Sequence, residues 1–195
     1  MITRGRDRHP TARSVRLLPL DAGRAWPLVA DARHHGRWVP LTRVALDGRD
    51  GPVPTDRPPR VGDVVRAVSG PGARHGGPGL VDRLRVERYE PPLGSVPGVA
   101  VFVRLGPVLL GSAQIEVEQA GPDASRVTWS ESAHLRGLPR GATAGLGALL
   151  VDVMLALTMP RVVREAGSLA RCTQRIAGIS PIHATNSGGT RNITD

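Results

Sequence analysis

The longest apolar segment, residues 142 to 159, constrains the fold of this 195-residue chain most strongly. A membrane-spanning helix needs about 20 predominantly apolar residues. This segment is shorter, contains Asp152 and ends before Pro160. The pattern predicts a buried amphipathic helix that begins near Leu149, is kinked at Pro160 and extends to about Cys172. Such a helix needs a sheet or other helices to cover its apolar side.

The residues before this segment have the patterns of strands. Residues 112 to 119 alternate apolar and polar side chains, the turn Gly121-Pro122-Asp123 follows, and residues 126 to 135 complete a hairpin. We expect further strands at 14–20, 41–46, 61–68, 80–89 and 99–105, a helix at 22–32 capped by Asp21, and a short helical segment at 31–38 broken at Gly36. Residues 47–59, 70–78 and 137–147 are expected to be loops.

Several short motifs in this order also occur in a known family. They are Leu20-Asp21-Ala22 with Ala25-Trp26-Pro27-Leu28-Val29, then Arg37-Trp38, Val61-Gly62-Asp63, the hairpin from Gly121 to Trp129, and Leu157-Thr158-Met159-Pro160. On these motifs the chain resembles the START and birch-pollen-allergen superfamily, also called polyketide cyclase/dehydrase or SRPBCC. The resemblance covers about residues 14 to 171.

The resemblance implies an α+β helix-grip fold. In that fold a curved antiparallel sheet of about six to seven strands wraps around a long C-terminal helix, and two short helices follow the first strand. The resemblance further implies an internal cavity for a hydrophobic or amphipathic small molecule. We expect one such domain at residues 14–172, with a basic flexible arm at 1–13 and a disordered tail at 173–195.

The net charge of +9 is concentrated at the two ends of the chain. All 26 basic residues are arginines, against 17 acidic residues. Residues 1–16 carry +4 and residues 161–195 carry +3, so the body of the chain is nearly neutral. A basic chain of this kind can bind a polyanion. The location of the charge makes nucleic-acid binding an unfavoured prediction.

Glu131 is the candidate catalytic residue. It lies in the same strand phase as the apolar residues Val127 and Trp129, and an acid on an inward face is costly unless it is paired or contacts a ligand. It can act as a general base or accept a hydrogen bond from a ligand. Alternatively, it forms a salt bridge with an arginine of a neighbouring strand or reaches solvent at a strand end.

Four residues are candidates for ligand binding. Trp38 and Trp129 can stack on a planar ligand or belong to the core, and Arg66 and Arg104 can hold an acidic ligand group or point to water. His34 and His35 are adjacent on a helix, so they cannot share one metal from that face, and we expect them to be solvated. The sequence indicates no metal site and no cofactor.

We predict that the domain binds a lipid, polyketide or aromatic metabolite in its cavity, as a carrier or sensor. One alternative is a polyketide cyclase/dehydrase-type enzyme in which Glu131 moves a proton. A second is a binder of nucleic acids or anionic surfaces through the arginine-rich ends. The single cysteine, Cys172, and the absence of a secretory signal favour a cytoplasmic location, and the sequence does not fix the oligomeric state.

Overall fold

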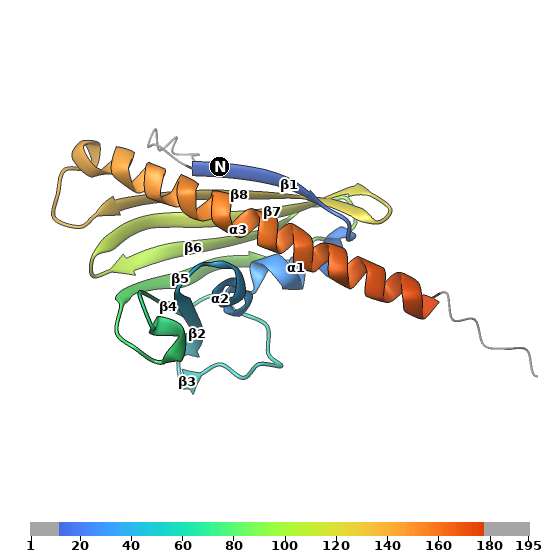
Figure 1. Cartoon of the computed structure of the whole chain (residues 1–195), viewed down its shortest axis with the longest axis horizontal. Coiled ribbons are helices and arrows are strands. Elements are labelled where there is room, and N and C mark those ends of the chain that lie inside the picture. Colours follow the sequence, from blue (N-terminus) through green and yellow to red (C-terminus); the bar gives the residue numbers. More distant parts are fainter. Residues whose placement is uncertain (1–11, 178–195) are drawn as a thin grey trace, which may run out of the picture.

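One antiparallel sheet of eight strands carries a long helix across one face (Figure 1). A computed structural model describes residues 12–177 of the chain. The elements are β1 (Ala12–Leu18), α1 (Ala22–Ala30), η1 (Ala32–His34), α2 (His35–Trp38), β2 (Thr42–Gly48), β3 (Gly51–Pro52), β4 (Val64–Ser69), η2 (Ala73–His75), β5 (Leu80–Glu90), β6 (Gly98–Gly106), β7 (Leu109–Gly121), β8 (Ala124–Leu135) and α3 (Arg140–Ala177). The α+β helix-grip architecture expected from the sequence is confirmed.

The strands lie in the order β1-β8-β7-β6-β5-β4-β2-β3. Strands β4 to β8 follow one another through hairpins, whereas β1 pairs with the last strand, β8. The short helices between β1 and β2 therefore cross from one edge of the sheet to the other. The sheet has eight strands, whereas about six to seven were predicted. The additional strand is the two-residue β3, which pairs with β2 within the expected loop 47–59.

The core lies where α1 and α3 pack against the β1, β8 and β7 side of the sheet. The largest fully buried side chains there include Leu18, Leu20, Ile115, Leu155 and Met159. Asp21 caps α1 as predicted, since its Oδ1 accepts a hydrogen bond from the backbone N–H of Arg24 at 3.0 Å. Among the described residues, no helix combines the length and hydrophobicity needed to cross a membrane.

The expected loop at 137–147 is largely wrong, because α3 begins at Arg140 rather than near Leu149. Gly147 explains why glycine occurs inside this helix. A Cβ atom at this position would lie 2.0 Å from the backbone oxygen of Ala133, so only glycine allows α3 to approach β8 so closely. The helix then continues without interruption through Pro160 to Ala177, five residues beyond the predicted end.

The predicted helix break at Gly36 is also wrong. Gly36 lies inside α2, and a Cβ atom there would come within 3.4 Å of the backbone nitrogen of Val44 in β2. The glycine therefore permits a close approach between helix and strand.

Strand β4 begins at Val64 rather than at Val61, because Gly62, with φ of +95°, places the preceding residues in a turn.

The predicted flexible ends meet the described part of the chain at two places. Ala12 and Arg13, assigned to the arm, form the start of β1, and residues 173–177 of the predicted tail are helical. The remaining residues of both segments, 1–11 and 178–195, lie outside the described residues and carry a net charge of +2, out of the +7 that the sequence places at the two ends.

Candidate functional site

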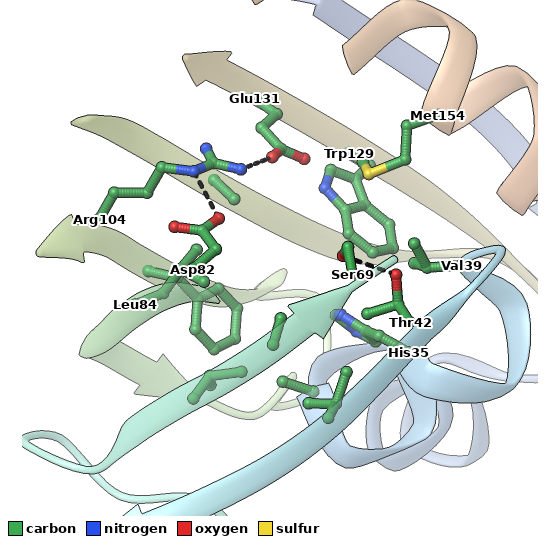
Figure 2. Close-up of a pocket in the computed structure, with 16 residues that line it drawn as sticks. His35, Val39, Thr42, Ser69, Asp82, Leu84, Arg104, Trp129, Glu131 and Met154 are labelled. Atoms are coloured by element: carbon green, nitrogen blue, oxygen red, sulfur yellow. Dashed lines mark hydrogen bonds and ion pairs between the residues drawn. The ribbon is translucent and has the colours of Figure 1, made fainter. Parts of the chain in front are cut away.

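A cavity of about 120 Å³ lies between the sheet, the short helices and α3 (Figure 2). Strands β2, β4, β5, β6, β7 and β8 supply most of its wall, η1 and α2 contribute to one side, and Met154 of α3 lies on another. Most of the lining is apolar. The polar lining residues are His35, Thr42, Ser69, Asp82, Arg104 and Glu131, together with the indole of Trp129.

Alternation along three strands brings charged side chains to this cavity. Arg104 shares its phase on β6 with the buried residues Ala100 and Phe102, and Glu131 shares its phase on β8 with the buried residue Trp129. Asp82 lies in the same phase of β5 as Val86, which is fully buried. The three residues meet although 49 positions separate the first from the last.

Arg104 is the centre of this cluster. Its Nε donates to Asp82 Oδ2 at 2.8 Å, its Nη1 donates to the backbone oxygen of Ser132 at 3.0 Å, and its Nη2 donates to Glu131 Oε1. The side chains of Arg104 and Glu131 are only 7% and 4% exposed. Burial alone would lower the pKa of Arg104, but the charges of Glu131 and Asp82 outweigh burial and raise it above its ordinary value. The guanidinium is therefore permanently charged.

Glu131 is thus inward-facing, as predicted, and it is ion-paired. Its partner lies on β6, the strand next but one to β8, rather than on an adjacent strand. The alternative in which Glu131 reaches solvent at a strand end does not occur. Arg104 does not point to water either, since its guanidinium is held by two carboxylates and a backbone oxygen.

Trp129 and His35 form an aromatic pair at the other side of the cavity. Their ring centroids are 4.7 Å apart with an angle of 43° between the planes. Trp129 is 4% exposed, and its indole N–H has no hydrogen-bond partner among the described residues. A buried donor without a partner costs free energy, so this edge of the indole is a place where a ligand acceptor would be stabilising.

The prediction that His35 is solvated is wrong. Its Nε2 lies 2.8 Å from the backbone oxygen of Val29, and because a carbonyl oxygen only accepts, Nε2 carries the proton and Nδ1 is an acceptor. Burial lowers the pKa of His35 to about 4, so the ring is neutral near pH 7. Ala32, His35 and Val39 all line the cavity. Their spacing in the sequence is that of one helix face, so this pattern could have indicated that His35 faces inward.

Asp82 is a lining residue that the sequence analysis missed. The argument applied to Glu131 would have found it, because Asp82 shares a strand phase with Leu84 and Val86. Thr42 and Ser69 were also missed. Their hydroxyl groups lie 2.8 Å apart and hydrogen-bond to each other at the ends of two paired strands, β2 and β4.

Two predicted ligand-binding residues do not line the cavity. Trp38 is buried nearby, and its indole Nε1 donates to Glu165 Oε2 of α3 at 2.6 Å. Arg66 lies on the opposite face of the sheet, where its side chain is 46% exposed and pairs with Asp47 at 3.1 Å. The structure therefore brings together Arg104, Trp129 and Glu131 and separates them from Trp38 and Arg66.

The sequence matches no protein-family model and no curated protein. Solved structures do match. A hypothetical protein from Helicobacter pylori aligns at a TM-score of 0.57 and 14% identity, over 84% of this chain and 91% of that chain. A protein from Thermobifida fusca aligns at 0.54 and 20% identity, over 82% of this chain and 95% of that chain. A START superfamily protein from Mycobacterium smegmatis aligns at a TM-score of 0.48 and 13% identity, over 87% of this chain and 99% of that chain.

The chain has a helix-grip fold, which these solved structures share. The antiparallel strand order, the paired short helices after β1 and the long C-terminal helix all agree with it. At these identities the likeness establishes architecture alone, since one fold hosts many functions. Any function of this chain must therefore be argued from its own cavity.

Proposed function

We propose that this protein binds a small, largely hydrophobic molecule in the cavity between its sheet and α3, as a carrier or sensor. The observation that carries the proposal is the cavity itself, with an apolar wall and a few convergent polar groups. Ligand sites commonly have this composition, because apolar surface supplies affinity and a few polar groups supply orientation.

The volume limits the size of the ligand. A cavity holds one water molecule at roughly 10–15 Å³ of the same kind of volume, and an engineered apolar cavity of about 150 Å³ binds benzene. At about 120 Å³, this cavity is close to that size, so it fits a small ring-bearing molecule. Of the classes expected from the sequence, a small aromatic metabolite fits this volume better than a long lipid or an extended polyketide.

Two features favour binding over catalysis. Glu131, the proposed proton-transfer residue, is held by Arg104, and His35, with a pKa of about 4, is a weak base near pH 7. General acid–base catalysis is most efficient when the pKa of the group lies near the working pH. Conversion of a bound ligand, followed by mass spectrometry, would instead support the cyclase/dehydrase-type alternative.

A cavity-filling variant tests the proposal. Ala67 lines the cavity on β4, so Ala67→Phe should abolish the binding of indole, measured by calorimetry on the full chain. Ala120→Phe, at an exposed position of β7, is the matched control and should bind indole as the wild type does. Equal binding of indole by both variants would place the ligand elsewhere and contradict the proposal.

A further inference from the structure

We infer that the ligand of this cavity carries a positively charged, hydrogen-bond-donating nitrogen, as in a small ring-bearing amine. This inference rests on the proposed function and narrows its ligand class. It comes from the balance of charge around Arg104, which has two carboxylates and one guanidinium on the cavity wall.

The cavity wall is acidic although the protein is basic. Two carboxylates, Asp82 and Glu131, pair with one guanidinium, that of Arg104, so the cluster has a formal charge of −1. His35 is the other titratable lining residue, and burial keeps it neutral. A net charge in a mostly apolar environment is costly unless an opposite charge lies beside it. A cationic ligand would supply that charge, although the net charge of +9 on the whole chain disfavours the approach of cations.

Arg104 does not provide a site for an acidic ligand. All three of its nitrogen atoms already donate hydrogen bonds, to Asp82, Glu131 and the backbone of Ser132. A ligand carboxylate could reach only the second N–H groups of Nη1 and Nη2, and it would add a third negative charge beside Asp82 and Glu131. Arg104 is instead a positioning residue that holds two carboxylates at the cavity wall.

Both carboxylates keep an oxygen available as an acceptor. Glu131 pairs with Arg104 through Oε1, and none of the described residues donates to its Oε2, which points towards the Trp129 side of the cavity (Figure 2). Asp82 Oδ1 is buried and has no hydrogen-bond partner among the described residues. Buried acceptors are normally paired, and an ammonium group has three donors for them.

The aromatic side of the cavity is compatible with such a ligand. Trp129 lies close to the Glu131 carboxylate, and an indole face attracts cations as well as apolar rings (Figure 2). The Trp129 indole N–H is a donor, unlike the carboxylate oxygens, and it has no partner among the described residues. A hydrogen-bond acceptor elsewhere on the ligand would satisfy it. The cavity thus has acceptors for a charged nitrogen and an aromatic surface for a ring.

Three probes of one size and different charge test the inference. We expect calorimetry at pH 7 and fixed ionic strength to show that the full chain binds benzylamine at least about tenfold more tightly than benzyl alcohol, with benzoate weakest, because hydrogen bonds to charged groups exceed neutral ones by such a factor. The positive surface cannot produce this order, since it favours benzoate.

Two near-isosteric variants test whether the cavity carboxylates cause the preference for benzylamine over benzyl alcohol. Glu131→Gln and Asp82→Asn each bring the formal charge of the cluster to zero, and each should reduce the ratio of amine to alcohol affinity at least about fivefold. Asp47→Asn, which removes a carboxylate from the exposed pair with Arg66, is the matched control and should leave the ratio unchanged. Circular dichroism checks that each variant is folded, and either variant suffices if the other does not fold.

The outcomes separate the inference from the proposed function. If benzyl alcohol or benzoate binds as tightly as benzylamine, or if neither neutralising variant changes the ratio, the inference is overturned and cavity binding stands. If none of the probes binds and Ala67→Phe changes nothing for indole, the inference and the proposed function both fail.

Discussion

Arg104 and Arg66 occupy the same sheet and have opposite surroundings. Arg104 on β6 faces the cavity, is 7% exposed and pairs with two carboxylates. Arg66 on β4 faces the other side of the sheet, is 46% exposed and pairs with Asp47 alone. Residue type and local pattern do not distinguish them, since both are arginines within apolar strands. Strand phase alone separates a cavity wall from a solvated surface.

The difference in burial changes what each ion pair contributes. An exposed pair gains little, because water screens the charges and the side chains lose freedom. A buried pair also contributes little relative to a well-packed apolar core, but removing one partner leaves an uncompensated charge. The buried cluster should therefore be far more sensitive to substitution than the exposed pair.

The largest effect is expected from Arg104→Met. This change leaves Asp82 and Glu131 without their cation, so the free energy of unfolding should fall by about 3–5 kcal/mol. Arg66→Met is the matched control and should cost no more than about 1 kcal/mol. Urea denaturation measures both. Similar losses for the two variants would remove the distinction between the two sites.

The second effect is a pH dependence caused by His35. Its pKa is about 4 in the folded protein and about 6.5 in an unfolded chain, so between these values the unfolded state binds more protons. The neutral His35 ring therefore contributes its full stabilisation above pH 6.5. As the pH falls towards 4, the free energy of unfolding should decrease by about 3 kcal/mol. Thermal unfolding measured across this range should show the loss.

A His35→Gln variant should lose distinctly less stability between pH 6.5 and 4 than the wild type. His75→Gln, at an exposed position in η2, is the control and should follow the wild-type curve. If His35→Gln and the wild type show the same pH profile, His35 is not the group responsible.

The third prediction compares substitutions of the two buried tryptophans, Trp38 and Trp129, in stability and in ligand affinity. Trp38→Phe removes a hydrogen bond to the Glu165 carboxylate and should cost about 2 kcal/mol in the free energy of unfolding, with ligand affinity little changed. Trp129→Phe removes no hydrogen bond within the described residues, so it should cost less stability but weaken ligand binding. Denaturation and calorimetry on the same two variants measure both quantities. Weaker binding by Trp38→Phe alone would reverse the roles assigned here.

The smallest effect is expected from Asp47→Asn. Its partner Arg66 remains about half exposed, so the free energy of unfolding should change by less than about 1 kcal/mol, and the change should shrink further in high salt. Urea denaturation at low and high salt measures it. A loss comparable with that of Arg104→Met would show that exposure does not govern these pairs.

Much of the fold was predictable from local pattern. The period-two alternation of residues 112–119, the Gly121-Pro122-Asp123 turn and the following strand appear as β7 and β8. The start of α3 was not predictable, because Gly147 is a helix-breaking signal in the sequence and a packing contact in the structure. Propensity describes a segment in isolation, whereas packing against β8 selects glycine at this place.

Residue pattern was enough to predict the order of the elements, the shared phase of Glu131 and Trp129, and the excess of arginine at the chain ends. It did not determine which face of β6 is interior. Val99, Val101 and Val103 form one apolar phase, and Ala100, Phe102 and Arg104 form the other. Contacts between strands make the Arg104 phase the interior one, because Asp82 and Glu131 reach Arg104 from other strands and compensate its buried charge. The site depends on charges that are distant in sequence and adjacent in space.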